Sequence, residues 1–348
     1  MLLLAKFTKG LLLCVMDEDI LVSVVIPVYN AAAHIQETIS SIIRQDHENI
    51  EIIIVNDASA DSSAADAKTL LENSGRAFRI IDHTKNLGVA AARNTGLDSA
   101  KGRYIWFCDS DDRPEKNFVS RLLAEAEDKN ADIAFCGIKQ YYESENRLID
   151  DPIAFIPDSL SSEKYLTSWA EGKLYLWSIW NFLFRRELIT KNGLRFHEGC
   201  RLGEDTEFLL KAVACASRVC CVNEMLYTYV HHSGQVTESR KSPEMLRHVM
   251  LSRLRAGRFL LRHTHSRKIR NYILNYYIPD IIVKQFTACA VIDDRKHFRK
   301  LKRTLKHKTM RKILQNAAKF SAAAPELFIK AIMLLYAPEL YYLLRKGR

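Results

Sequence analysis

Residues 104–112 read Tyr-Ile-Trp-Phe-Cys-Asp-Ser-Asp-Asp, five apolar side chains followed at once by three carboxylates. A continuous apolar run of this length predicts a strand buried on both faces, which is typical of a parallel sheet covered by helices. The carboxylates would then lie where the strand ends, at the edge where open α/β sheets bind ligands. The stretch therefore predicts an α/β sheet with a polar site at the carboxyl ends of its strands.

Strand and helix patterns alternate on both sides of this stretch. Short β-branched or aromatic runs predict buried strands, and apolar side chains three or four positions apart predict amphipathic helices. Buried strands are expected at residues 21–28, 50–55, 78–81, 104–108 and 132–136, with further strand-like runs at 218–222 and 226–232. The expected helices cover residues 31–44, 61–71, 89–100, 115–128 and 206–216. This alternation predicts an α/β fold with a mostly parallel sheet flanked by helices.

Two other predicted strands also end in polar residues. The strand at 21–28 is followed by Tyr29 and Asn30, and the strand at 50–55 is followed within two residues by Asp57. The Asp57 carboxylate could accept a hydrogen bond from the N3–H of uracil, and the Tyr29 ring could stack on the base. The alternative for Asp57 is an Asx turn that leads into the next helix.

The carboxylates after the central strand suit a divalent cation. Asp109 and Asp111 are two positions apart, and Mg²⁺ or Mn²⁺ prefers oxygen ligands and keeps phosphate oxygens in its shell. Such a cation would offset the charge that builds on a departing diphosphate. A D-x-D pattern taken alone also describes solvated carboxylates in a turn. Its position at a strand end favours the metal site.

A second acidic pair, Glu204 and Asp205, opens the helix expected at 206–216. The helix dipole favours an ionised carboxylate there, so Asp205 could act as a general base toward an acceptor hydroxyl. The alternative is acidic capping of the helix. The adjacent histidines His231 and His232 could approach a metal or lie on the surface. Trp177 and Trp180 could stack on a sugar or pack in the core.

Charge divides the chain into regions. Residues 241–348 carry 25 Lys and Arg against 6 Asp and Glu, whereas the first 240 residues carry 26 against 35. The basic region has helical patterns throughout, so it suits an anionic membrane surface, nucleic acid, or a helical bundle with solvated basic faces. We expect an N-terminal extension at 1–19, an α/β domain at 20–240 and a basic helical region at 241–348.

Few features point to export or to zinc. The apolar segment at 1–15 is interrupted by Lys6 and Lys9, and no small-residue cleavage site follows it. No segment approaches the roughly 20 apolar residues of a membrane span. None of the eight cysteines forms a C-x-x-C pair, which argues against a zinc site. Buried thiols in a reducing cytoplasm are the expected arrangement.

Five motifs in this order resemble glycosyltransferase family 2, which has the GT-A nucleotide-sugar-binding fold. They are VSVVIPVYN at 22–30, NDAS at 56–59, NLG at 86–88 with ARNTG at 92–96, YIWFCDSDD at 104–112, and GED at 203–205. The resemblance extends from about residue 22 to residue 237. The chain departs from the usual D-D-G-S motif at Asn56 and Ala58, which leaves the detail of uridine binding open.

The resemblance implies a role for each matched residue. The donor would be bound by Pro27, Tyr29, Asn30, Asp57, Arg93, Asp109 and Ser110. A divalent Mn²⁺ or Mg²⁺ would be held by Asp109 and Asp111, with His231 as a candidate from the loop that follows. Asp205 would be the general base, with Glu204 beside it.

The implied activity is inverting transfer of a sugar from a UDP-hexose or UDP-N-acetylhexosamine to a lipid-linked or oligosaccharide acceptor. The setting would be surface polysaccharide synthesis at the inner face of a bacterial cell membrane, with peripheral contact through the basic region. A processive synthase would show Q-x-x-R-W and several spans, and neither is present. The remaining alternatives are a nucleotidyltransferase, which would release pyrophosphate, and a non-catalytic scaffold that binds membrane or nucleic acid.

Overall fold

The computed structural model describes residues 20–151, 159–174, 178–233, 235, 243–318 and 325–346. Their contacts group them into two compact units. The first unit contains the described residues up to 200 together with 212–233, and the second contains 201–211 and the described residues from 235 onward. By their contacts, residues 201–211 thus group with the C-terminal helices, although they precede the last strand of the sheet in the sequence.

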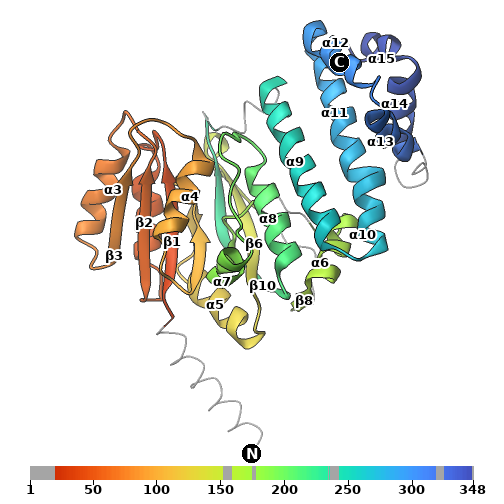
Figure 1. Ribbon diagram of the computed structural model, residues 1–348. Coiled ribbons are helices and arrows are strands. Elements are labelled where there is room, and N and C mark those ends of the chain that lie inside the picture. Colours follow the sequence, from red (N-terminus) through yellow and green to blue (C-terminus); the bar gives the residue numbers. More distant parts are fainter. Residues whose placement is uncertain are drawn as a thin grey trace, which may run out of the picture. The chain divides into compact units, whose positions relative to one another are not determined.

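The first unit contains a mixed, mostly parallel sheet (Figure 1). Its strands are β1 (Val22–Val28), β2 (Ile50–Asn56), β3 (Ala77–Asp82), β4 (Tyr104–Phe107), β5 (Arg113–Pro114), β6 (Ile133–Tyr142), β7 (Arg147–Asp151), β8 (Ser159–Ser161), β9 (Phe182–Arg185) and β10 (Arg218–His231). The main order is β3-β2-β1-β4-β9-β6-β10-β5, with β7 beside β6 and β8 beside β10. Strands β1 to β4 pair in parallel, as do β6 and β10. The predicted parallel sheet is confirmed.

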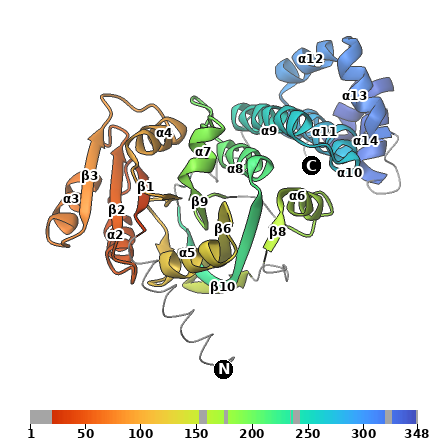
Figure 2. The same ribbon diagram turned by 60° about the horizontal axis from the view of Figure 1, so that its bottom comes forward.

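Helices cover both faces of this sheet. They are α2 (Ile35–Ile43), α3 (Ser63–Glu72), α4 (Val89–Ser99), α5 (Phe118–Asp128), α6 (Ser162–Ala170) and α7 (Arg186–Lys191), with a 3₁₀ turn η1 (Glu143–Glu145). Figure 2 shows α2 and α5 on one side of the sheet and α4 and α7 on the other. Alternate β1 residues Val22, Val24 and Ile26 pack with α2, α3 and α5. Because successive strand residues point to opposite faces, Val25 is directed to the α4 side.

Helix α4 lies unusually close to β1. A Cβ added at Gly96 would lie 2.2 Å from Cγ1 of Val25, a distance that no packed structure tolerates. The glycine in the ARNTG motif is therefore required by helix–sheet packing. Strand β9 was not predicted from the sequence: it is only four residues long and runs antiparallel between β4 and β6. An apolar run this short does not distinguish strand from helix.

The second unit is helical. It contains the first two turns of α8 (Glu204–Cys215), then α9 (Pro243–His263), α10 (Arg267–Tyr272), the π-helix η3 (Ile273–Tyr277), α11 (Ile278–Val291), α12 (Arg295–Thr304), α13 (Lys308–Ala318), α14 (Pro325–Tyr336) and α15 (Pro338–Arg345). Its core is apolar and includes Leu260, Phe286, Phe298 and Leu334. The predicted helical character of this region is confirmed. None of the helices in the described ranges has the length and apolar content needed to cross a bilayer.

Candidate active site

The carboxyl ends of β1, β2 and β4 meet at one edge of the sheet. Strand β1 lies between β2 and β4, and the helices after β1 and before β4 cover opposite faces. This is the switch point at which open α/β sheets leave a crevice for ligands. The residues that follow the three strands are the motifs singled out in the sequence, which begin at Tyr29, Asp57 and Asp109.

Three carboxylates cluster directly after β4. One oxygen from each of Asp109, Asp111 and Asp112 lies within 4.8 Å of the others. The side chains of Asp109 and Asp111 are each 25% exposed, whereas Asp112 is buried. Asp112 accepts hydrogen bonds from the Tyr227 hydroxyl and the Val230 N–H, both at 3.0 Å. Its burial, and then the charges of Asp111 and Asp109, raise its pKa well above the usual range.

The chemistry of this cluster fits a hard divalent cation. Two partly exposed carboxylates two residues apart supply the oxygen ligands that Mg²⁺ and Mn²⁺ prefer. Asp112 is directed inward by its bonds to β10, so it ties the acidic loop to the sheet. The arrangement therefore offers Asp109 and Asp111 outward and uses Asp112 as an anchor.

Arg93 of α4 lies beneath the cluster. Its side chain is 2% exposed, and its Nη2 donates to Oδ1 of Asp109 at 2.7 Å. The guanidinium also lies 5.5 Å from the centre of the Phe196 ring. A buried cation at this distance orients Asp109 and offsets part of the negative charge of the cluster.

A pair of histidines from distant parts of the chain flanks Asp111. Nε2 of His232 lies 2.9 Å from Oδ2 of Asp111, and its Nδ1 lies 2.9 Å from the Ser233 carbonyl oxygen. The ring of His34 lies 4.0 Å from that of His232. The hydrogen bond to Asp111 raises the pKa of His232, whereas burial and then the neighbouring His232 lower the pKa of His34. Both ring nitrogens of His232 face acceptors, which suits the protonated form.

The two adjacent histidines thus lie in different places. His231 has its Nε2 3.0 Å from Oε1 of Gln140, and its ring stacks on Tyr142 at 4.2 Å. His232, not His231, contacts Asp111. The metal role predicted for His231 stays a prediction, whereas the places of His34 and His232 beside Asp111 were not predictable from the sequence. The alternation of side chains near a strand end indicates only that one of two neighbours can face the site.

Asp57 binds the loop that precedes α4. Its Oδ1 accepts from the Leu87 N–H at 2.8 Å and lies 2.7 Å from Nδ1 of His83, and its Oδ2 accepts from the Gly88 N–H at 2.7 Å. His83 in turn contacts Thr95 of α4 through Nε2, at 3.0 Å. The carboxylate is therefore held in a fixed orientation at the N-terminus of α4.

The side chain that accepts a backbone hydrogen bond within this loop is Asn56, one residue earlier than Asp57. Oδ1 of Asn56 accepts from the Ser59 N–H at 3.0 Å, and Ala58 has a φ of 60°. The departure from glycine at position 58 therefore places a Cβ in the left-handed region, which is unfavourable. The loop is fastened to Asn30, whose Oδ1 accepts from the Ala60 N–H at 2.8 Å. Tyr29, which precedes Asn30, has 51% of its surface exposed.

The other predicted residues of the first unit lie near these groups or in the core. Pro27 is buried within β1 opposite Val55, and Ser110 is partly exposed between Asp109 and Asp111. Trp180 is buried, and its ring stacks on Tyr227 at 4.5 Å and on Tyr229 at 5.3 Å. Trp180 is thus a core residue, and Trp177 lies outside the described residues.

Glu204 and Asp205 form the first turn of α8, and α9 holds that turn in place. The Glu207 side chain is 2% exposed and forms an ion pair with the Arg255 guanidinium of α9. The Nε–Oε2 and Nη2–Oε2 distances are 2.8 and 2.7 Å. Gly203 has a φ of +88°, and a Cβ there would lie 2.5 Å from the Ser252 hydroxyl oxygen. The backbone at the GED motif thus packs directly on α9. Sequence reasoning missed this support because nothing in the spacing links residue 207 to residue 255.

The chain is similar to known proteins of one family. Residues 23–193 match the family described as glycosyl transferase family 2. The chain is 36% identical over 237 residues to the uncharacterized glycosyltransferase EpsJ of Bacillus subtilis, covering 66% of each chain. It is 29% identical over 227 residues to the succinoglycan biosynthesis protein ExoO of Rhizobium meliloti, covering 63% of this chain and 62% of ExoO. The matched region spans just under two thirds of each relative.

A solved structure shares the fold at low sequence identity. The crystal structure of S. aureus TarS 1-349 in complex with UDP superposes with a TM-score of 0.68 and 18% identity, over 92% of this chain and 89% of that chain. The likeness establishes the GT-A-like fold, a mostly parallel sheet flanked by helices.

Proposed function

Because the chain belongs to glycosyltransferase family 2, we propose that it moves a sugar from a nucleoside-diphosphate donor onto an acceptor hydroxyl with inversion. The observation that carries the proposal is the set of three carboxylates at the carboxyl edge of β4, with the buried Arg93 paired to Asp109. A switch-point crevice lined by outward carboxylates suits a metal-chelated diphosphate. A single displacement at the anomeric carbon would give inversion.

The diphosphate end of the donor would lie at the acidic cluster. Asp109 and Asp111 would hold a Mg²⁺ or Mn²⁺ ion, which when bound supplies positive charge to the leaving diphosphate. Arg93 orients Asp109, and Asp112 fixes the loop to β10. His232 holds Asp111 by a hydrogen bond and adds a positive charge when protonated. These residues would keep the carboxylates in place before the donor arrives, so little reorganisation is needed.

The nucleoside would lie between β1 and β2. Tyr29 has an exposed ring for stacking on a base, and the Asp57 carboxylate is already oriented by the amides of Leu87 and Gly88. A carboxylate can accept from the N3–H of uracil, so we propose UDP as the nucleotide, with a hexose or an N-acetylhexosamine as the sugar. The solved UDP complex of TarS, which shares the fold, supports this choice.

Deprotonation of the acceptor would fall to Asp205. Its place in the first turn of α8 favours the ionised carboxylate, and the Glu207–Arg255 pair fixes that turn. Within reach of the acceptor hydroxyl, Asp205 would take its proton as the glycosidic bond forms. Glu204 is buried in the same turn.

The acceptor would be a lipid-linked or oligosaccharide intermediate of surface polysaccharide synthesis. The name of ExoO, a succinoglycan biosynthesis protein, supports this class. We place the protein peripherally at the inner face of the bacterial cell membrane, with contact through its basic C-terminal region. Cell fractionation tests the location: recovery with membranes at low salt and release at high salt are expected, and complete recovery in the supernatant at low salt would contradict it.

Release of UDP from a panel of UDP-sugars, with Mn²⁺ or Mg²⁺, tests the reaction. The wild-type protein should release UDP only with metal, and Asp109→Ala and Asp205→Ala should abolish release while the proteins remain folded. Release of pyrophosphate instead would indicate a nucleotidyltransferase. Neither binding nor turnover of any nucleotide-sugar would contradict the proposal and favour a non-catalytic scaffold.

A further inference from the structure

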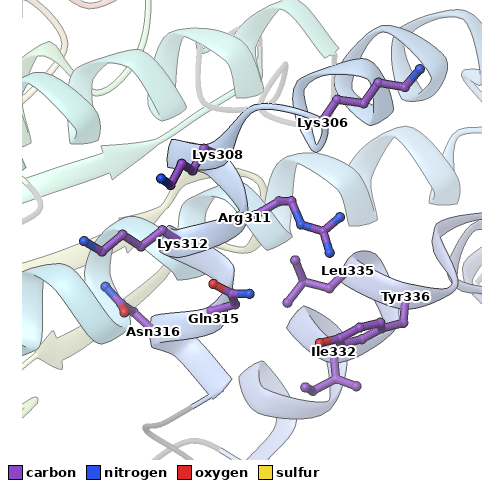
Figure 3. A pocket seen from close by; sticks show the side chains of 9 residues that line it. All are labelled: Lys306, Lys308, Arg311, Lys312, Gln315, Asn316, Ile332, Leu335 and Tyr336. Atoms are coloured by element: carbon purple, nitrogen blue, oxygen red, sulfur yellow. The ribbon is translucent and has the colours of Figure 1, made fainter.

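The second unit has a groove between α13 and α14 whose lining includes none of the residues proposed for the transfer reaction. Its volume is about 870 Å³. One side carries polar and cationic side chains, and the other carries three apolar or aromatic ones, as Figure 3 shows: Lys306, Lys308, Arg311, Lys312, Gln315 and Asn316, opposed by Ile332, Leu335 and Tyr336. The Arg311 guanidinium extends toward Leu335 and Tyr336. The groove thus has a cationic side and an apolar side, and the apolar side is called its apolar floor below.

The segment that supplies the groove cations is strongly basic. Residues 295–318 contain ten Lys and Arg and no Asp or Glu. The four acidic residues between 291 and 346 each contact other partners: Asp293 with Lys346, Asp294 with His297, Glu326 with Lys330, and Glu339 with Lys302. Across the described ranges, none of the four groove cations forms an ion pair with a carboxylate. Such like charges repel one another unless an external anion binds.

The apolar side of the groove continues onto the surface. Ile329, Ile332 and Tyr336 follow the i, i+3, i+7 spacing of one face of α14. Ile329 is 55% exposed and Tyr336 71% exposed. On α15, Leu340, Leu343 and Leu344 are also exposed. A row of exposed apolar side chains beside the groove cations matches the boundary between lipid headgroups and acyl chains.

We propose that this groove binds the phosphate headgroup of an anionic membrane lipid, with the exposed residues of α14 and α15 inserted among the acyl chains. Charge complementarity selects the headgroup, and the apolar floor selects an amphiphile over a free anion. Nucleic acid would satisfy the cations but would leave the exposed leucines of α15 in water. The groove would be the site of the membrane contact proposed above, and lipid binding there would not depend on the transferase activity.

Flotation of the full-length chain with vesicles tests the site. Vesicles of phosphatidylglycerol and phosphatidylcholine should bind the protein, and vesicles of phosphatidylcholine alone should not. The double variant Lys306→Glu/Arg311→Glu should lower the partition coefficient by more than about ten-fold, since each cation near an anionic surface contributes about five-fold. Tyr336→Ser should lower it further. Both cations are exposed, so the melting temperature should not change, and Lys306→Ala/Arg311→Ala serves as a second, milder variant.

A charge-matched control comes from the first unit. Lys68→Glu/Lys191→Glu makes the same change in net charge at two exposed lysines of α3 and α7, and it should leave vesicle binding unchanged. Equal loss in this control would show a general charge effect and overturn the site. Three other results would also overturn it: equal binding to phosphatidylcholine vesicles, displacement by millimolar glycerol 3-phosphate, and tighter binding to a homopolymeric RNA than to vesicles. Because UDP release is measured separately, failure here leaves the proposed reaction untouched.

Discussion

The two units of this chain differ in how their chemistry is encoded. In the first unit the candidate site residues follow strand ends, so Tyr29, Asp57 and Asp109 stand out in the sequence and lie at one edge of the sheet. In the C-terminal helices of the second unit, from residue 243 onward, the sequence shows only helical periodicity and excess positive charge. A site built on loops at a sheet edge requires particular residue types at particular positions, whereas a basic helical surface requires only charge and spacing.

Helix α8 carries a motif residue but packs with the C-terminal helices. Its first turn carries the predicted base Asp205, yet by contact residues 201–211 belong with the C-terminal helices. Helix α9, in which no motif is recognisable, therefore supports the GED motif. The comparison implies that damage to α9 should affect catalysis, although α9 carries no predicted catalytic group.

The largest effect is expected from Asp205→Asn. Loss of a general base lowers kcat by about 10²- to 10⁴-fold, while donor affinity should be retained because the residues proposed to bind the donor are all in the first unit. Steady-state kinetics with the preferred UDP-sugar gives both values. Asp205→Glu, which keeps the carboxylate, is the control and should retain more activity. A kcat within two-fold of wild type for Asp205→Asn would show that another group is the base.

Glu207→Gln should lower stability and catalysis together. Removing one partner of a buried ion pair costs about 3 kcal/mol, and here Arg255 and Lys211 both lose their carboxylate. Denaturant unfolding gives the free energy, and kinetics below the transition should show a lower kcat at an unchanged KM for the donor.

Glu244→Gln on the exposed face of α9 is the matched control for this variant and should change neither stability nor kcat. If Glu207→Gln lowered only stability, α9 would be a structural support without influence on Asp205.

Alanine substitution at one glycine in each unit tests how tightly the helices pack there. Gly96→Ala would place a Cβ 2.2 Å from Val25, and it should destabilise by about 2 kcal/mol, as overpacked cores do. Gly257→Ala in α9 meets Ile278 at 3.2 Å, and the better helix propensity of alanine should offset most of that contact. Thermal melts should therefore separate the two variants clearly. Equal melting temperatures would mean that α4 can move away from β1.

The smallest effect is expected in the loop that follows β2, at residues 57–60. Ala58→Gly should stabilise the protein by about 1 kcal/mol, because φ of 60° is unfavourable for alanine and not for glycine. Ala60→Gly, two residues away and outside the left-handed region, should be slightly destabilising and is the control. Destabilisation by Ala58→Gly would indicate that the alanine methyl group packs usefully in this loop.

The sequence indicated the sheet and the carboxylate cluster because buried strands and D-x-D spacing are local features. It did not indicate β9, since four apolar residues fit a strand or a helix equally well. It also missed the His34–His232 contact and the Glu207–Arg255 pair, which join residues 198 and 48 positions apart. Such contacts depend on tertiary packing, and periodicity carries no information about them. The anchoring of Asp57 by the amides of Leu87 and Gly88 is a further example.

The central claim is that the acidic cluster at the end of β4 binds the donor diphosphate together with a metal. Calorimetric titration of UDP into the protein, with and without Mn²⁺, tests this claim most directly. We expect binding that depends on Mn²⁺ in the wild-type protein and in Asp205→Asn, and loss of that dependence in Asp109→Ala. Equally tight UDP binding without metal, or unchanged metal-dependent binding by Asp109→Ala, would contradict the account.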